Sequence, residues 1–286
     1  MEAIVPDKCE GERLDKALAV LGCYKSRREA REAILQGAVY LDGRRVRVAS
    51  RPVNAGARLR AEPVQPASLT LAPVTVLWES SGLLALDKPG GVPFAPTREA
   101  VEGTLLYALA RERNLQMRSL HPIHRLDTPT SGAVLVATDK AEAARLSAAL
   151  RRGRVQKQYL AWVHGAPEPE RGEWTWPLAE SPGNVMRVDP SGKEARTRYA
   201  VLRAAGGRSL LLLEPMTGRT HQLRVHCATA GYPIVGDRKY GKGAEGQARA
   251  LLHAWKISFP ACDGTIVEVT APPPQDMEEQ GKGRGR

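Results

Sequence analysis

The stretch HRLDTPTSG, residues 124–132, carries three ionisable side chains directly before the apolar run AVLVAT. These side chains are His124, Arg125 and Asp127, and the run that follows is typical of a buried strand. Charged side chains are seldom buried unless they are paired. A polar turn is the commoner explanation, because Asp-x-Pro and Ser-Gly are turn sequences. The alternative is that Asp127 reacts with a substrate.

A second polar stretch, MTGRTHQLRVH, follows the apolar run SLLLLEP. We expect Thr217 and Gly218 to end that strand and to start a helix. Backbone N–H groups and Arg219 would then lie at a helix N-terminus, which is a ready site for a phosphate group.

Farther along this expected helix, His221 and Arg224 are three residues apart and would share one face. A surface helix with two isolated charges is the more common case. However, Arg224 lies between two apolar residues, and a partly buried arginine needs a carboxylate partner. Asp127 is a plausible partner, and the pair would hold the aspartate ionised and oriented.

The stretch VQKQYLAWVHG predicts a strand that contains Tyr159. A lone tyrosine in a strand is ordinarily a core aromatic. The residues alone do not raise Tyr159 above that interpretation.

Residues 10–62 predict a small basic domain of two helices and a hairpin. In the second helix, Ser26 and Glu29 have capping-box spacing and Gly37 is a natural C-cap, and Asp42-Gly43 is a hairpin turn signal. Cations at helix starts oppose the macrodipole, so the basic cluster favours an anion-binding surface over a merely solvated one. The cluster consists of Arg13, Lys16, Lys25, Arg27, Arg28 and Arg31.

The rest of the chain predicts a larger α+β domain. Residues 1–9 form an N-terminal extension, residues 63–73 a Pro-rich linker, and residues 278–286 a disordered tail. Between them, residues 74–277 contain eight apolar strand patterns and three helical ones. Several strands follow one another without a helix, so we expect a mixed, largely antiparallel sheet.

The net formal charge of +11 favours a polyanionic partner, with nucleic acid first and an anionic membrane surface second. No run reaches the ~18 apolar residues that a membrane-spanning helix needs, and the first residues lack a signal-peptide hydrophobic region. We therefore expect a cytoplasmic protein that does not bind membranes and is a monomer.

Cofactor chemistry has no support in the sequence. The four cysteines are scattered, without the pairs that zinc sites use, and we interpret them as ordinary thiols. Neither the phosphate-binding pattern G-x-x-x-x-G-K-[ST] nor G-x-G-x-x-G after a strand occurs. We expect no metal and no cofactor.

Several motifs, in the same order along the chain, resemble the RluA-type pseudouridine synthases. They are HRLDTPTSGAVLVA, K-x-Y-L-A-W-V-H-G, GKEARTRYAVL, TGRTHQLRVHCATAGYPIVGDRKYG, LLHAWKISFP and APPPQDM. Residues 10–62 are similar to an S4 RNA-binding domain, which often precedes that catalytic domain. The resemblance implies an isomerase that moves the glycosidic bond of a uridine in RNA from N1 to C5, without metal or cofactor.

The resemblance also implies roles for individual residues. Asp127 matches the essential aspartate, Tyr159 the tyrosine that stacks on the uracil and serves in removing the C5 proton, and Arg224 the basic partner of the aspartate. Arg125 matches the arginine that helps to evert the nucleotide. Leu252 matches the apolar residue beneath the base, and Arg219 and His221 are expected to bind substrate.

The sequence thus predicts an RNA pseudouridine synthase. Large-subunit ribosomal RNA is the expected substrate and transfer RNA the alternative, and the target uridine cannot be read from the residues. A non-catalytic RNA-binding or ribosome-assembly protein would not need to keep Asp127, Tyr159 and Arg224 together. A metal-dependent nuclease is a second alternative, which is disfavoured because it would need clustered carboxylates.

Overall fold

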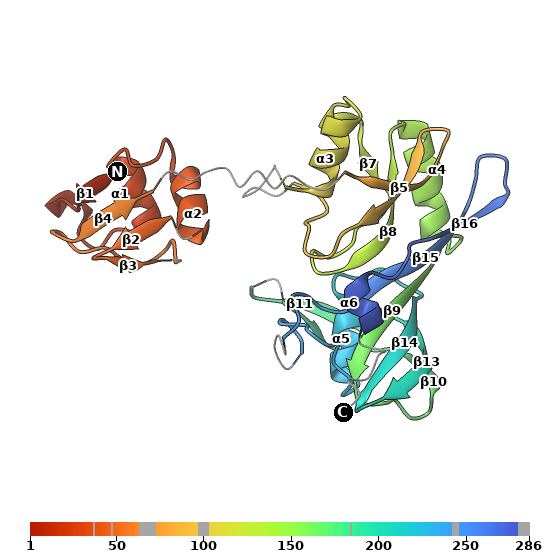
Figure 1. Cartoon of the computed structure of the whole chain (residues 1–286). Helices are drawn as coiled ribbons and strands as arrows, with labels where there is room; N and C mark the ends of the chain where they lie inside the picture. Colours follow the sequence, from red (N-terminus) through yellow and green to blue (C-terminus); the bar gives the residue numbers. More distant parts are fainter. Residues whose placement is uncertain are drawn as a thin grey trace. The chain divides into compact units, whose positions relative to one another are not determined.

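The computed structural model describes residues 1–36, 38–46, 48–62, 73–96, 103–183, 185–241 and 246–279. These residues form two compact units, residues 1–62 and residues 73–279 (Figure 1). The predicted linker, except Pro73, and the predicted C-cap Gly37 lie outside the described residues. So does the predicted tail, except for residues 278 and 279, which belong to the last helix.

The first unit packs two helices on a small antiparallel sheet with strand order β1-β4-β2-β3. Its elements are β1 (Glu2–Ile4), η1 (Asp7–Cys9), α1 (Leu14–Val20), α2 (Arg27–Gln36), β2 (Val39–Leu41), β3 (Arg44–Arg45) and β4 (Arg58–Ala61). Leu14, Leu18 and Ile34 of the helices are fully buried in its core. Residues 1–9, which we expected to precede the domain, contribute β1 to its sheet, because Glu2–Ile4 pairs with Arg58–Arg60 of β4.

Two of the local signals in this unit are confirmed: the cap at Ser26 and the Asp42-Gly43 turn. The Ser26 hydroxyl accepts a hydrogen bond from the backbone N–H of Glu29 at 3.2 Å, and the Glu29 carboxylate accepts one from the N–H of Lys25 at 2.8 Å. Asp42 and Gly43 both have positive φ, at 50° and 75°, which is the two-residue turn that joins β2 to β3.

The described residues of the second unit form a ten-stranded sheet, a separate two-stranded sheet and four α-helices. Its first elements are β5 (Thr75–Ser80), β6 (Leu83–Lys88), α3 (Leu105–Glu112), η2 (Met117–Ser119), β7 (His121–Pro122), β8 (Ser131–Ala137), α4 (Lys140–Arg151) and β9 (Gln156–His164). The later ones are β10 (Arg171–Trp174), β11 (Leu178–Ser181), β12 (Val185–Val188), β13 (Thr197–Ala205), β14 (Arg208–Pro215), α5 (Gln222–Thr229), β15 (Leu252–Pro260), β16 (Ile266–Thr270) and α6 (Gln275–Glu279).

The large sheet is mixed and largely antiparallel, as predicted. Its main path runs β10-β13-β14-β9-β15-β8-β6-β5, with β16 paired to β15 and β7 paired to β8. Among the pairs formed by described residues, only β15 with β8 is parallel. All eight predicted strands and all three predicted helices occur. The short, partly exposed strands β7, β10, β11 and β12 and the short helix α6 were not predicted.

The centre of the large sheet is covered on both faces. Every residue of β8 is buried, which explains its continuous apolar sequence. Along β6 the side chains alternate: Leu84 and Leu86 join the hydrophobic cluster that contains α3 residues, whereas Leu83 joins the cluster that contains Leu146 of α4. This buried centre is a rigid support for the loop that precedes β8.

Gly132 allows the close approach of β15 to β8. It has φ +107°, and a Cβ atom there would lie 2.3 Å from the backbone oxygen of Ala254. Any other residue would therefore clash with β15. The glycine of HRLDTPTSG is thus a strand residue, and the turn we expected to extend to it ends at Thr130.

Candidate active site

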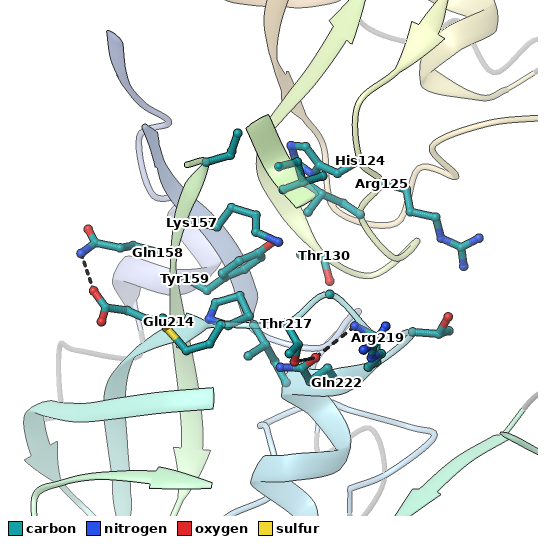
Figure 2. A pocket seen from close by; sticks show the side chains of 18 of the residues that line it. His124, Arg125, Thr130, Lys157, Gln158, Tyr159, Glu214, Thr217, Arg219 and Gln222 are labelled. Carbon is teal, nitrogen blue, oxygen red and sulfur yellow. Dashed lines mark hydrogen bonds between the residues drawn. The ribbon is translucent and has the colours of Figure 1, made fainter. Parts of the chain in front are cut away.

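A pocket of about 810 Å³ opens in the second unit where the loop before β8, the strand β9 and the loop before α5 meet (Figure 2). All seven residues that we predicted for catalysis or substrate binding line it. They are Arg125, Asp127, Tyr159, Arg219, His221, Arg224 and Leu252. Residues separated by more than one hundred positions in the sequence are therefore brought to one place.

The turn that follows Asp127 is fixed through its backbone carbonyls. The N–H of Thr130 donates to the Asp127 carbonyl at 3.0 Å. The Thr128 carbonyl accepts from the buried Lys88 ammonium at 3.1 Å and from the N–H of Gly91 at 2.8 Å. Because Leu126 also packs into the core, the chain on both sides of Asp127 is held.

Two carboxylates share the Arg224 guanidinium. Asp237 accepts from Nε and from the second terminal nitrogen, both at 2.8 Å, whereas Asp127 Oδ2 accepts a single bond from Nη1 at 3.2 Å. The side chains of Arg224 and Asp237 are 7% and 1% exposed, and that of Asp127 is 16% exposed. The predicted Arg224–Asp127 contact exists, but the main partner of Arg224 is Asp237.

The charges of this trio stabilise one another. Burial would lower the pKa of Arg224, but Asp237 and Asp127 raise it. Burial would likewise raise the pKa of Asp237, but Arg224 and the N–H groups of Lys239 and Tyr240 lower it. One cation between two anions leaves a net charge of about −1 when all three are ionised.

The second oxygen of Asp127 is available to a substrate. Oδ2 carries the contact with Arg224 and lies 3.8 Å from Nε2 of His221. Among the described residues, none donates a hydrogen bond to Oδ1. Burial lowers the pKa of His221 more than the Asp127 charge raises it, so His221 is neutral near pH 7. Its Nδ1 is bonded to the Tyr240 hydroxyl at 2.6 Å.

Tyr159 and Lys157 project from β9 into the pocket, with His124 on one side and the loop from Thr217 to Gln222 on the other (Figure 2). Tyr159 is 7% exposed, and its pKa is raised by burial and by the Asp127 charge, so it holds its proton at neutral pH. Burial lowers the pKa of Lys157. Tyr159 is thus both a core residue and a wall of the pocket.

The loop before α5 differs from the prediction. The helix begins at Gln222, not at Thr217-Gly218, because His221 has a left-handed φ of 54°. The Gln222 side-chain oxygen accepts from the Thr217 hydroxyl at 2.7 Å and from the N–H of Arg219 at 3.0 Å. Its amide nitrogen donates to the Arg196 carbonyl at 2.9 Å. These bonds replace the helical turn, so the predicted helix start at Thr217-Gly218 is wrong, whereas phosphate binding near Arg219 stays a prediction.

The remaining predicted pocket residues have different surroundings. Arg125 is exposed, and its guanidinium extends away from Tyr159 (Figure 2). The Arg219 Nε donates to the Glu194 carbonyl at 2.8 Å, which ties this arginine to the loop before β13. Leu252 is 3% exposed and begins β15. The pocket therefore has exposed cations at some positions and apolar walls at others.

The six basic residues that we predicted to bind RNA lie in the first unit and are all exposed. They do not share one environment. Arg13 and Arg27 both contact the buried carboxylate of Asp15, and Lys16 forms an ion pair with Glu12.

A model of the RNA pseudouridylate synthase family matches residues 82–229, and a model of the S4 domain matches residues 12–59. The chain belongs to the RNA pseudouridine synthase family. As a pseudouridine synthase it is an isomerase acting on RNA, with an S4 domain near its N-terminus.

Relatives cover nearly the whole length of this pseudouridine synthase. An uncharacterized RNA pseudouridine synthase of Chloroflexus aurantiacus is 37% identical over 96% of this chain and 90% of its own length. A ribosomal large subunit pseudouridine synthase D of Nitrosomonas europaea is 33% identical over 97% of this chain and 86% of its own. Human RNA Pseudouridylate Synthase Domain Containing 1 has a similar structure, with a TM-score of 0.59 at 31% identity, over 70% of this chain and 83% of the human one.

Three residues of the pseudouridine synthase site were not predicted from the sequence. Asp237 lies within a motif that we quoted, but no partner was assigned to it. Lys88 follows an apolar strand, and its burial with carbonyl partners could not be read from its neighbours. Lys157 could have been found, because it is two residues before Tyr159 and therefore on the same face of β9.

Among the described residues, no group of three or more His, Cys, Asp or Glu side chains could hold a metal ion. All four cysteines are free. In the described part of the synthase, no helix is both long enough and apolar enough to cross a bilayer.

A buried histidine next to Leu252 should make the synthase sensitive to acid. His253 is fully buried, its Nε2 donates to the Ala271 carbonyl at 3.1 Å, and its Nδ1 accepts from the Ser131 hydroxyl at 2.9 Å. Burial lowers its pKa to about 4. Below pH ~6.5 the unfolded chain takes up a proton that the folded chain excludes, so stability is lost as the pH falls from ~6.5 toward 4.

Between pH 7 and pH 5 we expect His253 to account for a loss of about 2 kcal/mol in the free energy of unfolding. Urea denaturation at the two pH values measures it. His253→Gln should be less stable than wild type at pH 7, but its free energy of unfolding should fall less on acidification. His121→Gln changes a partly exposed position, and its free energy of unfolding should fall as much as that of wild type. Equal acid sensitivity of wild type and His253→Gln would contradict the assignment.

Proposed function

We propose that the chain converts uridine to pseudouridine in large-subunit ribosomal RNA, with Asp127 as the reacting group. The observation that carries the assignment of the site is the Asp127 carboxylate, which is held by one bond from Arg224 beside a buried tyrosine and whose Oδ1 has no donor among the described residues. The choice of RNA is supported by the Nitrosomonas europaea relative, whose name specifies the ribosomal large subunit.

One carboxylate is sufficient for this chemistry. Glycosidases use two, one to protonate a leaving oxygen and one to attack or to activate water. Uracil leaves through N1 as a stabilised anion, so it needs no such acid, and it must be retained rather than replaced by water. Asp127 either attacks C1′ or removes a proton from C2′, and both routes break the C1′–N1 bond. Rotation of the uracil then allows the C1′–C5 bond to form. In the first route this breaks the bond between Asp127 and C1′, and in the second Asp127 returns the proton to C2′. C5 then loses its proton and N1 gains one.

Tyr159 is proposed to stack on the uracil and to serve in the removal of the C5 proton. Since its raised pKa keeps the phenol protonated, it can take that proton only if it passes its own to another base. Leu252 would pack against the base from β15. Arg125, which is exposed and extends away from Tyr159, would hold the everted nucleotide or the strand that it left. Arg219 and His221 would contact the substrate from the loop before α5.

We infer that residues 10–62 bind RNA and that residues 74–277 form the catalytic domain. Support comes from separate hydrophobic cores, one within residues 1–62 and others within the second unit. A ribosomal RNA substrate implies that the enzyme works in the cytoplasm.

The test is to incubate the protein with RNA that carries tritium at uridine C5 and to follow tritium release. Unmodified large-subunit ribosomal RNA should release tritium, and a matched pool of transfer RNA should release none. Release from transfer RNA alone would assign the enzyme to that substrate and would overturn the proposal. No release from either RNA would overturn the activity itself.

A further inference from the structure

A buried carboxylate joins two exposed arginines on the first unit. The Asp15 side chain, in the first turn of α1, is only 2% exposed. Arg13 donates to it from Nε at 3.1 Å and from a terminal nitrogen at 2.9 Å, and Arg27 approaches from the start of α2 with Nε at 3.2 Å. One acid therefore connects the N-terminal ends of both helices.

The arrangement leaves donors directed outward. The Arg13 and Arg27 side chains are 45% and 54% exposed. Each guanidinium has five N–H groups, and the contacts with Asp15 occupy two of them in Arg13 and one in Arg27. Two free guanidiniums on separate helices would repel each other and sample many rotamers, whereas here the same carboxylate holds both.

We propose that Asp15 is a positioning residue for RNA binding, whose carboxylate presents the outward N–H groups of Arg13 and Arg27 together to the phosphate backbone. Planar guanidiniums held in place bind phosphate with less loss of rotamer freedom than free ones. This inference rests on the proposed RNA-binding role of residues 10–62.

The proposal predicts an effect opposite to that of simple charge. Asp15→Asn raises the net charge by one, which by itself strengthens attraction to RNA. If Asp15 positions the arginines, the same change weakens binding, because the asparagine cannot hold two cations. Glu12→Gln is the matched control, since it makes the same charge change in the same unit and releases Lys16 from an exposed ion pair.

The experiment is filter binding of the full-length chain to in vitro transcribed large-subunit ribosomal RNA over a range of salt. We expect Asp15→Asn to bind about tenfold more weakly, with a salt slope smaller by about one unit. Glu12→Gln should bind as tightly as wild type or up to about twofold more tightly. The double variant Arg13→Gln/Arg27→Gln should bind more weakly, and adding Asp15→Asn to it should cause no further loss.

The other outcomes separate the possible failures. If Arg13→Gln/Arg27→Gln binds like wild type, this surface does not bind RNA and the proposed role of the domain fails. If that variant is weakened but Asp15→Asn binds more tightly, the surface stands and the positioning role is overturned. If Asp15→Asn still weakens binding when both arginines are absent, the aspartate acts through the fold, and the positioning role is again overturned.

Discussion

Asp127→Asn is expected to keep the fold and to reduce tritium release by at least about a thousandfold. The amide neither attacks C1′ nor removes a proton at neutral pH, so both routes to breaking the glycosidic bond are closed. The fold should survive, because Arg224 retains its two bonds to Asp237 and the turn after Asp127 is held through backbone carbonyls.

The measurement is single-turnover release of tritium from uridine C5, with circular dichroism and urea denaturation to monitor folding. Asp139→Asn is the matched control, because this carboxylate caps α4 outside the pocket and accepts from the Glu142 N–H. Because asparagine caps a helix about as well as aspartate, the change should cost less than about 1 kcal/mol of stability and leave release unchanged. Release by Asp127→Asn within tenfold of wild type would remove Asp127 from the reaction.

Asp237→Asn should damage both stability and activity, although Asp237 was not among the predicted catalytic residues. Removal of the main partner of a buried charge costs about 3–5 kcal/mol, because Arg224 then keeps only its single 3.2 Å bond to Asp127. Arg224 would then have Asp127 as its one anionic partner and would shift toward it. A displacement of about 1 Å at a reacting group can cost about a hundredfold in rate.

Urea denaturation and tritium release test the two parts of this prediction. Glu268→Gln is the control, because it breaks an exposed ion pair with Lys256 and should cost less than about 1 kcal/mol without changing release. Wild-type stability of Asp237→Asn would contradict the role of Asp237 as the main partner of Arg224. Wild-type release from a destabilised variant would limit that role to the fold.

The features predicted correctly from the sequence are those set by residues close together in the chain. The Asp42-Gly43 turn needs only two positive φ angles, and the strand β8 needs only an uninterrupted apolar run. The shared pocket required more than local pattern. We predicted that these residues share a site because the ordered motifs resemble a known family. Sequence spacing alone does not predict that β9 lies beside β15.

The features predicted wrongly or missed depend on distant partners. The start of α5 was misplaced because the Gln222 side chain bonds Arg196, whose position follows from the sheet. Asp237 is connected to Arg224 across a turn after the helix, which no helical spacing indicates. Asp15 was not singled out from the sequence, because its contact with Arg27 depends on how α1 packs against α2.

The parallel pairing of β15 with β8 has a consequence for synthesis of the chain. His253 of β15 pairs with Ser131 of β8, and the two residues are 122 positions apart in the sequence. Asp127 lies on the approach to β8, and Leu252 begins β15, so the walls of the pocket meet only when these strands pair. A nascent chain that has not yet reached residue 252 therefore cannot have an assembled pocket.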